Sequence, residues 1–527
     1  MLSLLLGLAA ALRILFYTGF FGSDEVTYIE SAVKITNGDW HASDYIGATR
    51  YGMNLPIALF ISLFGLSEFS ANLWPFICSV GEVALVFTIA RWLWNTKAAV
   101  ISAGLLALMP IHVHFAGRMM ADSPLAFFLS FSMALLIYGA HSKSWLSLMM
   151  AGLAWGGVFW VKESVALLYA PVFMLLSVVL NRVNVKLLWV LTGMGIAVAA
   201  NCYLMYLVSG NPLHIFVVMQ KAIVNVAGMT EKTSPWFYLR YLFLDIRHTL
   251  FLGLLAVAGV LLFTRYYFHG VQTHPATQFV IFWSFLMVGM FSLAVVSFSP
   301  IQLVMKQTNY MLIFLCPLVL LAGWFLAELP PRVLNSLSVL LALGSLLLIA
   351  LEQQAVTVFT ANSKSSYDFL RSHPNTYLLA TTNNERAVDF YSLMDNRPEL
   401  RHQVSSFGDM DITDHAGLPV SLATRTLGKK VFAVVDLQTI GWGSKPGAMR
   451  GPADTPTCWN PVSTLPPAEL GRGHWVARQL MAAGFWLPES LRRAYSLLLQ
   501  PVSTPAPAYL YSVDTACLPQ SARSARL

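Results

Sequence analysis

The sequence predicts a mainly helical protein that crosses a membrane many times and ends in a water-exposed α/β domain. Of its 527 residues, 56% are hydrophobic and only 11% are charged, and the mean hydropathy is +0.61. An ordinary soluble domain carries about 25% charged residues. The first 354 residues hold 30 charged side chains, whereas the last 173 hold 29, so the soluble part lies at the carboxyl end.

The apolar runs predict about eleven transmembrane helices, since one span needs about 20 mainly apolar residues. A shorter run at 55–66 is expected to lie near the membrane interface. The predicted spans are 2–21, 71–92, 98–116, 123–141, 145–161, 164–180, 187–208, 242–263, 278–298, 307–327 and 333–351.

The connectors between these spans alternate between basic and acidic. One set carries Arg91, Lys97 and Lys143, and the other carries Asp39 and Glu68. The positive-inside rule places the basic set in the cytoplasm. The amino terminus is then cytoplasmic, and an odd number of spans puts the tail outside the cell membrane. We therefore expect a membrane domain at 1–352, with outer loops at about 22–70 and 210–241, and an extracytoplasmic domain at 353–527.

Two ionisable residues, Arg13 and Glu82, fall inside predicted spans. Each lies roughly 14–17 Å below the outer end of its span, from a rise of 1.5 Å per residue. An unpaired charge at that depth costs several kcal/mol. The sequence therefore predicts that Arg13 and Glu82 form an ion pair between two antiparallel helices; a proton relay is the alternative.

Charged and aromatic residues gather in the predicted outer loops. Each has a structural alternative: the acidic pair after Ser23 suits a helix start, the aromatic run suits an interfacial belt, and Lys306 suits a snorkelling cation. The carboxylates are Asp24, Glu25, Asp122 and Glu163; the cations are Arg118, Lys162, Lys232 and Lys306; and the aromatic residues are Trp236, Tyr238 and Tyr310.

Carboxylates and cations at one membrane face suit a transfer reaction. Cations stabilise the negative charge that builds on a departing phosphate, and a carboxylate accepts the proton of an attacking hydroxyl. Glycosyl transfer from a lipid-phosphate sugar needs both. No basic cluster with interleaved aromatic residues indicates nucleic-acid binding.

No metal site is predicted. His112 and His114 are two residues apart and point to different faces of a helix, so packing or interfacial roles are favoured. The sequence predicts no required cofactor, although a divalent ion shared by Asp24 and Asp122 stays open. Cys458 and Cys517 would be able to pair if the tail faces an oxidising compartment.

Four motifs make the chain resemble the GT-C glycosyltransferases, which are multi-spanning enzymes that use polyprenyl-phosphate sugars. The resemblance covers about residues 1–350. It is strongest to the branch of protein O-mannosyltransferases and the lipid A aminoarabinose transferase. The motifs are Asp24-Glu25-x-x-Tyr28 with Gly38-Asp39-Trp40, then Ala121-Asp122-Ser123-Pro124, Ser234-Pro235-Trp236-Phe237-Tyr238, and Lys306-x-x-x-Tyr310 before Cys316-Pro317.

The resemblance implies that Asp24 is the base or the acceptor-orienting carboxylate, with Glu25 and Asp122 in support. It also implies that Lys306 and Tyr310 lie near the donor phosphate. The predicted substrate-binding residues are Tyr28, Lys162, Glu163, Trp236 and Tyr238.

Two cations of the aminoarabinose branch are missing, at Thr27 and near Asn54-Leu55-Pro56. Further phosphate contacts are therefore assigned to Arg50, Arg118 and Lys232. These departures argue against aminoarabinose or lipid A as the specific substrate.

The tail is expected to form a small α/β domain. Its predicted strands are 377–381, 430–435 and 508–513, its predicted helices are 385–394 and 475–483, and 441–467 is expected to be a long loop.

The resulting prediction is an inverting glycosyltransferase of the cell membrane. It would transfer a hexose or pentose from a polyprenyl-phosphate donor to a hydroxyl of a glycan, lipid or protein on the outer face. A transporter or flippase of a lipid-linked sugar is the alternative, and such proteins place polar groups near the midplane, often in inverted repeats. A third candidate is a membrane-anchored binding protein whose tail carries the function.

Overall fold

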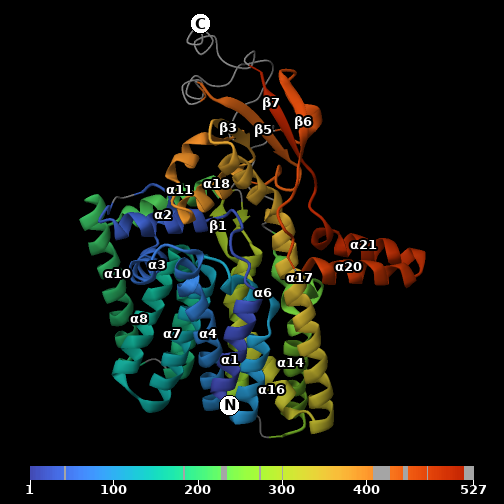
Figure 1. Ribbon diagram of the computed structural model, residues 1–527. Coiled ribbons are helices and arrows are strands. Elements are labelled where there is room, and N and C mark those ends of the chain that lie inside the picture. Colours follow the sequence, from blue (N-terminus) through green and yellow to red (C-terminus); the bar gives the residue numbers. More distant parts are fainter. Residues whose placement is uncertain are drawn as a thin grey trace. The chain divides into compact units, whose positions relative to one another are not determined.

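A computed structural model of the chain is shown in Figure 1. It describes residues 1–40, 43–181, 184–226, 234–271, 275–299, 301–407, 426, 428–442, 449–471 and 473–514. The chain divides into two compact units. The first unit comprises Met1–Tyr17 and Thr27–Ile349, and the second comprises Thr18–Val26 and Ala350–Leu527.

The first unit is a bundle of long apolar helices. Figure 1 shows α2 (Glu25–Thr36) and α11 (His214–Val226) lying across one end of this bundle. The bundle helices are α1 (Leu2–Leu15), α3 (Tyr51–Phe64), α4 (Glu68–Leu93), α5 (Thr96–Ala107), α6 (Pro110–Ala116), α7 (Asp122–Ser142), α8 (Trp145–Val161), α9 (Glu163–Asn181), α10 (Leu187–Ser209), α14 (Leu252–Phe268), α15 (Pro275–Leu293), α16 (Leu312–Glu328) and the first part of α17 (Pro331–Ser372).

Seven described helices are long and apolar enough to cross a membrane, or eight if the pair α5–α6, bent by 60°, forms one span. Four more apolar helices, α1, α3, α8 and α14, are 10–17 residues long. The multi-pass membrane bundle is therefore confirmed, whereas helix length alone does not establish eleven spans.

Several predicted spans are wrong in part. The span at 2–21 is helical only to Leu15. The span at 242–263 is broken into α12 (Phe237–Phe243), α13 (Ile246–Thr249) and α14, because polar Asp245 interrupts the apolar run and Leu250 has a positive φ of 52°. The span at 278–298 ends early: α15 stops at Leu293, and the β-branched residues that follow form an antiparallel hairpin of β1 (Val295–Phe298) and β2 (Ile301–Leu303).

Arg13 and Glu82 belong to one buried network, but His112 lies between them, so the predicted direct pair is corrected to a bridged one. Arg13 Nη2 lies 2.5 Å from His112 Nδ1, and His112 Nε2 lies 2.9 Å from Glu82 Oε2. Ser79 accepts a hydrogen bond from Arg13, and Ser130 donates one to Glu82. His112 thus links the two charged groups by hydrogen bonds, a role that differs from the packing or interfacial one expected from the sequence.

The second unit is built on a five-stranded sheet of order β4-β3-β5-β7-β6. The strands β3 (Thr376–Ala380), β4 (Val404–Ser406) and β5 (Lys430–Asp436) are parallel, whereas β7 (Ala508–Val513) is antiparallel to β5 and to β6 (Trp459–Leu465). Apolar clusters cover both faces of this sheet. The α/β domain is confirmed.

Local patterns located most of these elements. The predicted strands at 377–381, 430–435 and 508–513 correspond to β3, β5 and β7, and the predicted helices to α18 (Thr382–Met394) and α20 (Gly473–Ala483). The predicted loop at 441–467 is wrong in part because it contains β6, whose exposed Ser and Thr residues and Pro461 gave no strand alternation. Cys458 forms a disulfide, and Cys517 lies outside the described residues.

Candidate functional site

Five of the predicted site residues meet where helices of the first unit begin or end. Tyr28 lies on α2, Arg50 precedes α3, Asp122 begins α7, and Lys162 and Glu163 join α8 to α9. Each of these residues is buried, with at most 7% of its surface exposed. A helix start favours the carboxylates Asp122 and Glu163, and a helix end favours Lys162, through the helix dipole.

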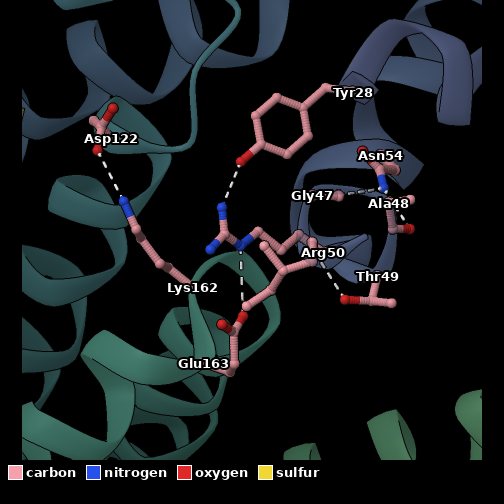
Figure 2. A network of polar contacts seen from close by, with 10 residues as sticks. Tyr28, Gly47, Ala48, Thr49, Arg50, Asn54, Asp122, Lys162 and Glu163 are labelled. Carbon is pink, nitrogen blue, oxygen red and sulfur yellow. Dashed lines mark hydrogen bonds and ion pairs between the residues drawn. The ribbon is translucent and has the colours of Figure 1, made fainter. Parts of the chain in front are cut away.

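Arg50 connects two of these residues, as Figure 2 shows. Its Nη1 donates to the Tyr28 hydroxyl at 2.8 Å, and its Nε lies 3.5 Å from Glu163 Oε2. The turn before Arg50 is held by Asn54, whose side-chain amide donates to the carbonyls of Gly47 and Ala48. Arg50 is therefore fixed in a rigid setting, as a phosphate-binding guanidinium requires.

Lys162 connects a second carboxylate to the late part of the bundle. Its Nζ lies 3.5 Å from Asp122 Oδ1 and 4.3 Å from the centre of the Tyr310 ring. The same Asp122 oxygen accepts a hydrogen bond from Asn309 at 2.9 Å. The short helix η3 (Thr308–Met311) thus brings the predicted Tyr310 to Lys162 and Asp122.

Both carboxylates have a spare oxygen. Among the residues that the structure describes, Asp122 Oδ2 and Glu163 Oε1 are buried and have no hydrogen-bond partner. Buried polar atoms without a partner are uncommon in folded proteins, and a water, an ion or a substrate group can satisfy them. A hydroxyl that entered this cluster would donate to either oxygen, while the neighbouring cations would stabilise a phosphate.

Lys306 precedes η3 and is fully buried. Its Nζ donates to the Val304 carbonyl at 3.3 Å, and burial lowers the pKa of its ammonium group. Val304 is held in turn by its N–H, which donates to the Ala294 carbonyl at the end of α15. The unpredicted β1–β2 hairpin therefore positions the lysine.

An apolar groove in the bundle leads toward the segment that carries Lys306. A hollow of about 1120 Å³ lies between the ends of α4, α7 and α9 and the start of α15, and it includes Trp92, Tyr138 and Phe285. A second hollow of about 370 Å³ continues from Phe285 between α9 and α15, past Gly289 to Ala294. This groove has the shape and lining that suit a long hydrocarbon chain.

A polar cavity of about 470 Å³ lies beside α2. Its walls include Trp40, Tyr45 and Tyr51 together with Glu30 and Asp39. The Trp40 and Tyr51 rings stack with their centres 6.2 Å apart. Thr27 and Ala48 also line this cavity and are sequence neighbours of Tyr28 and of the turn before Arg50.

Asp24 and Glu25 lie in Thr18–Val26, which belongs to the second unit rather than to the membrane domain expected from the sequence. The Glu25 carboxylate accepts hydrogen bonds from the backbone N–H groups of Phe21, Gly22 and Ser23 at 2.5–2.9 Å. Glu25 therefore shapes the turn that carries the half-buried Asp24.

Two residues of α18 hold this turn from the other side. Asn383 donates to the Phe21 carbonyl and Arg386 donates to the Gly22 carbonyl, each at 2.9 Å. A Cβ on Gly22, which has a φ of +93°, would lie 2.0 Å from Asn383 Nδ2. Only glycine fits this position without strain.

The remaining predicted residues are less closely tied to the cluster. Arg118 is buried with its guanidinium 5.0 Å from the Phe115 ring, Trp236 is 70% exposed, and Tyr238 is buried against Phe314. Lys232 lies outside the described residues. Sequence reasoning missed Asn309, although its place between Lys306 and Tyr310 in one motif was an available signal.

Within the described part of the chain, no group of three or more His, Cys, Asp and Glu side chains is placed to hold a metal ion. Asp122 and Glu163 instead each face a cation.

Comparison with solved structures gives the fold. ArnT from Cupriavidus metallidurans, bound to undecaprenyl phosphate, matches with a TM-score of 0.56 and 17% identity over 83% of this chain and 93% of that one. The fold is of the GT-C type. An oligosaccharyltransferase from Archaeoglobus fulgidus, in complex with Zn and sulfate, matches with a TM-score of 0.53 and 11% identity. The match covers 97% of the present chain and 88% of the oligosaccharyltransferase chain.

One sequence comparison points the same way. Residues 52–206 of the GT-C bundle match the family described as dolichyl-phosphate-mannose-protein mannosyltransferase. The comparison with curated proteins found no match. The resemblance inferred from the four motifs is thus confirmed at the level of the fold.

Proposed function

We propose that the protein is an inverting glycosyltransferase that moves a sugar from a polyprenyl-phosphate donor to a hydroxyl acceptor. The observation that carries the proposal is the buried cluster in which Arg50 and Lys162 face Glu163 and Asp122, each carboxylate keeping one oxygen open. Such a cluster joins phosphate binding to hydroxyl activation. The GT-C fold and the match to a mannosyltransferase family support it.

The donor lipid is proposed to occupy the groove between α9 and α15, with its phosphate near Lys306, Tyr310 and Lys162. The groove leads to Ala294, which the β1–β2 hairpin ties to Val304 and so to Lys306. Removing Lys306 and Lys162 from water weakens their hydration, so a phosphate gains more from them than from solvated cations. The similar ArnT structure holds undecaprenyl phosphate.

The acceptor is proposed to enter through the cavity beside α2, where aromatic rings and carboxylates suit a polyhydroxylated molecule. Its hydroxyl oxygen attacks the anomeric carbon, the carbon–oxygen bond to the phosphate breaks, and the configuration inverts. The hydroxyl proton passes to a carboxylate, and the lipid phosphate leaves with the bonding electron pair. Asp24 is the proposed base, and Asp122, with its open oxygen, is the second candidate.

The reaction is proposed to occur on the outer face of the cell membrane. The basic connectors support a cytoplasmic amino terminus and an extracytoplasmic carboxyl-terminal unit. The disulfide at Cys458 supports this orientation, because disulfides persist in oxidising compartments. We propose that no metal is needed, since the cations would stabilise the leaving phosphate.

The test is a transfer assay in proteoliposomes with the lipid-phosphate sugar that mass spectrometry finds in the purified protein. Asp24→Asn is expected to abolish transfer while the protein still folds and binds the lipid. Lys306→Met is expected to raise the KM for the donor about tenfold with little change for the acceptor. Lys143→Ala, at the opposite end of α7, serves as the matched control.

Several results would count against the proposal. Wild-type turnover by Asp24→Asn and by Asp122→Asn would remove both candidate bases. Movement of the intact lipid-linked sugar across the bilayer, without release of lipid phosphate, would favour the flippase. Loss of activity in a chelator, restored by a divalent ion, would overturn the metal-independent mechanism.

A further inference from the structure

The second unit carries a helical hairpin with large apolar side chains facing solvent. It consists of α20 (Gly473–Ala483), the short turn η6 (Gly484–Trp486) and α21 (Glu489–Ser503). Trp475 is 67% exposed, Phe485 72% and Trp486 89%. Three aromatic side chains this exposed on one small hairpin indicate a surface that something covers.

Hydrogen bonds hold the hairpin together, and the Phe485 ring adds a contact at 5.0 Å from the Arg492 guanidinium. The Tyr495 hydroxyl donates to the Leu480 carbonyl at 2.8 Å and so joins the two helices. Arg492 donates to the carbonyls of Phe485 and Leu487 and closes the turn. The hairpin is therefore a well-defined structural element that exposes its aromatic residues to solvent.

The position on α17 beside which the hairpin begins indicates what covers its exposed aromatic residues. Helix α17 has no charged residue between Arg332 and Glu352. These 19 uncharged positions span roughly 28 Å at 1.5 Å per residue, which is close to the thickness of about 30 Å of a bilayer's hydrocarbon core. Glu352 therefore marks the level on α17 where hydrocarbon gives way to the polar interface.

The segment before α20 runs alongside α17 and reaches the level of Glu352 where α20 begins. Ala468 donates its N–H to the Ala361 carbonyl, and Gly473 packs against the Gln354 side chain. Gln354 is two residues beyond Glu352, which is about 3 Å along the helix. In Figure 1 the hairpin then projects away from α17 instead of continuing along it.

The charges of the hairpin suit a lipid surface. Its described residues include Arg478, Arg492 and Arg493 but only one acid, Glu489. Tryptophan and arginine are enriched where proteins meet the headgroup layer, and basic amphipathic helices bind anionic lipids. The exposed aromatic side chains and the net positive charge of the hairpin therefore both indicate contact with a lipid surface.

We propose that the α20–α21 hairpin lies on the membrane surface, with Trp475, Phe485 and Trp486 inserted among the lipid headgroups. It anchors the second unit to the bilayer at a point separate from α17. The occupant is the lipid interface, and a second copy of the chain is the competing outcome of the test.

The test places the fluorophore NBD at position 486. Trp486→Cys is made in a Cys202→Ser background, labelled, and reconstituted in phosphatidylethanolamine–phosphatidylglycerol nanodiscs with one chain per disc. The unlabelled background is measured alongside. Val462→Cys, on the exposed strand β6 of the same unit, is the matched control. A second label replaces Trp475, and both positions are exposed enough to tolerate substitution.

Labels at 486 and 475 are expected to be quenched by headgroup-level nitroxide lipids and to be shielded from iodide at least fivefold relative to the label at 462. Equal access of iodide at all three positions overturns the proposal. Shielding that appears only in crowded proteoliposomes and is lost in single-chain discs also overturns it, because a second copy then covers the hairpin.

Discussion

Replacing Glu82 by glutamine removes one charge from the buried network that joins α1, α4, α6 and α7. Arginine can only donate, so the 2.5 Å contact makes His112 Nδ1 an acceptor and leaves the proton on Nε2, which donates to Glu82. Glutamine keeps an oxygen for His112, and its amide can donate to the Ser130 hydroxyl. Glu82→Gln therefore keeps the hydrogen bonds and deletes the charge.

The expected cost follows from the charge that remains. Arg13 is 1% exposed, and Glu82 is its acidic counter-ion in the network. Breaking a buried pair from one side costs about 3–5 kcal/mol. Because Glu82→Gln keeps the hydrogen bonds, we expect a cost at the lower end of this range, about 3 kcal/mol. An unfolding entropy of about 2 cal/mol/K per residue over roughly 340 residues then gives a Tm lower by about 4 °C.

The assay is thermal unfolding of the purified protein in one detergent at one pH. Ser132→Ala is the control, since Ser132 is buried on the same helix as Ser130 and donates to the Leu129 carbonyl; its cost should not exceed about 1 kcal/mol. Arg13→Met combined with Glu82→Met should cost less than the sum of Arg13→Met and Glu82→Met made singly, because the two buried charges leave together, although His112 loses both partners.

An unchanged Tm for Glu82→Gln would refute the charge argument. So would a double variant whose destabilisation equals the sum of its two single variants, since the two charges would then be independent.

Three further outcomes test the site and its support. Gly289→Trp should fill the groove between α9 and α15 and raise the donor KM about tenfold. Gly195→Trp, with equally open space around its Cβ, should leave the donor KM unchanged. Equal donor KM values for the two variants would contradict lipid binding in this groove. Gly22→Ala should lower kcat at least tenfold with a small loss of Tm, because the turn before α2 must shift; an unchanged kcat would separate this turn from the reaction. Burial, together with the neighbouring Glu385, raises the pKa of Asp389 to about 7, so the folded state holds a proton that the unfolded state releases near pH 4. Stability should therefore fall between pH 4 and pH 7 in calorimetry and lose that slope in Asp389→Asn; the same slope in the variant would assign it to another group.

The sequence alone determined the features that depend on local physics. Hydropathy located the membrane helices because burial in lipid requires long apolar runs, and period-two patterns located β3, β5 and β7. Short motifs indicated the GT-C fold and most of the charged cluster. Polar interruptions such as Asp245 were underweighted, so one predicted span was in fact three helices.

Only the tertiary structure decided which side chains meet. Arg50 and Glu163 are 113 residues apart, and Asn383 and Phe21 are 362 apart. No local propensity encodes such pairings, because they depend on how packed helices and strands bring distant chain segments together. Helix packing placed His112 between Arg13 and Glu82 and assigned the turn carrying Asp24 to the second unit.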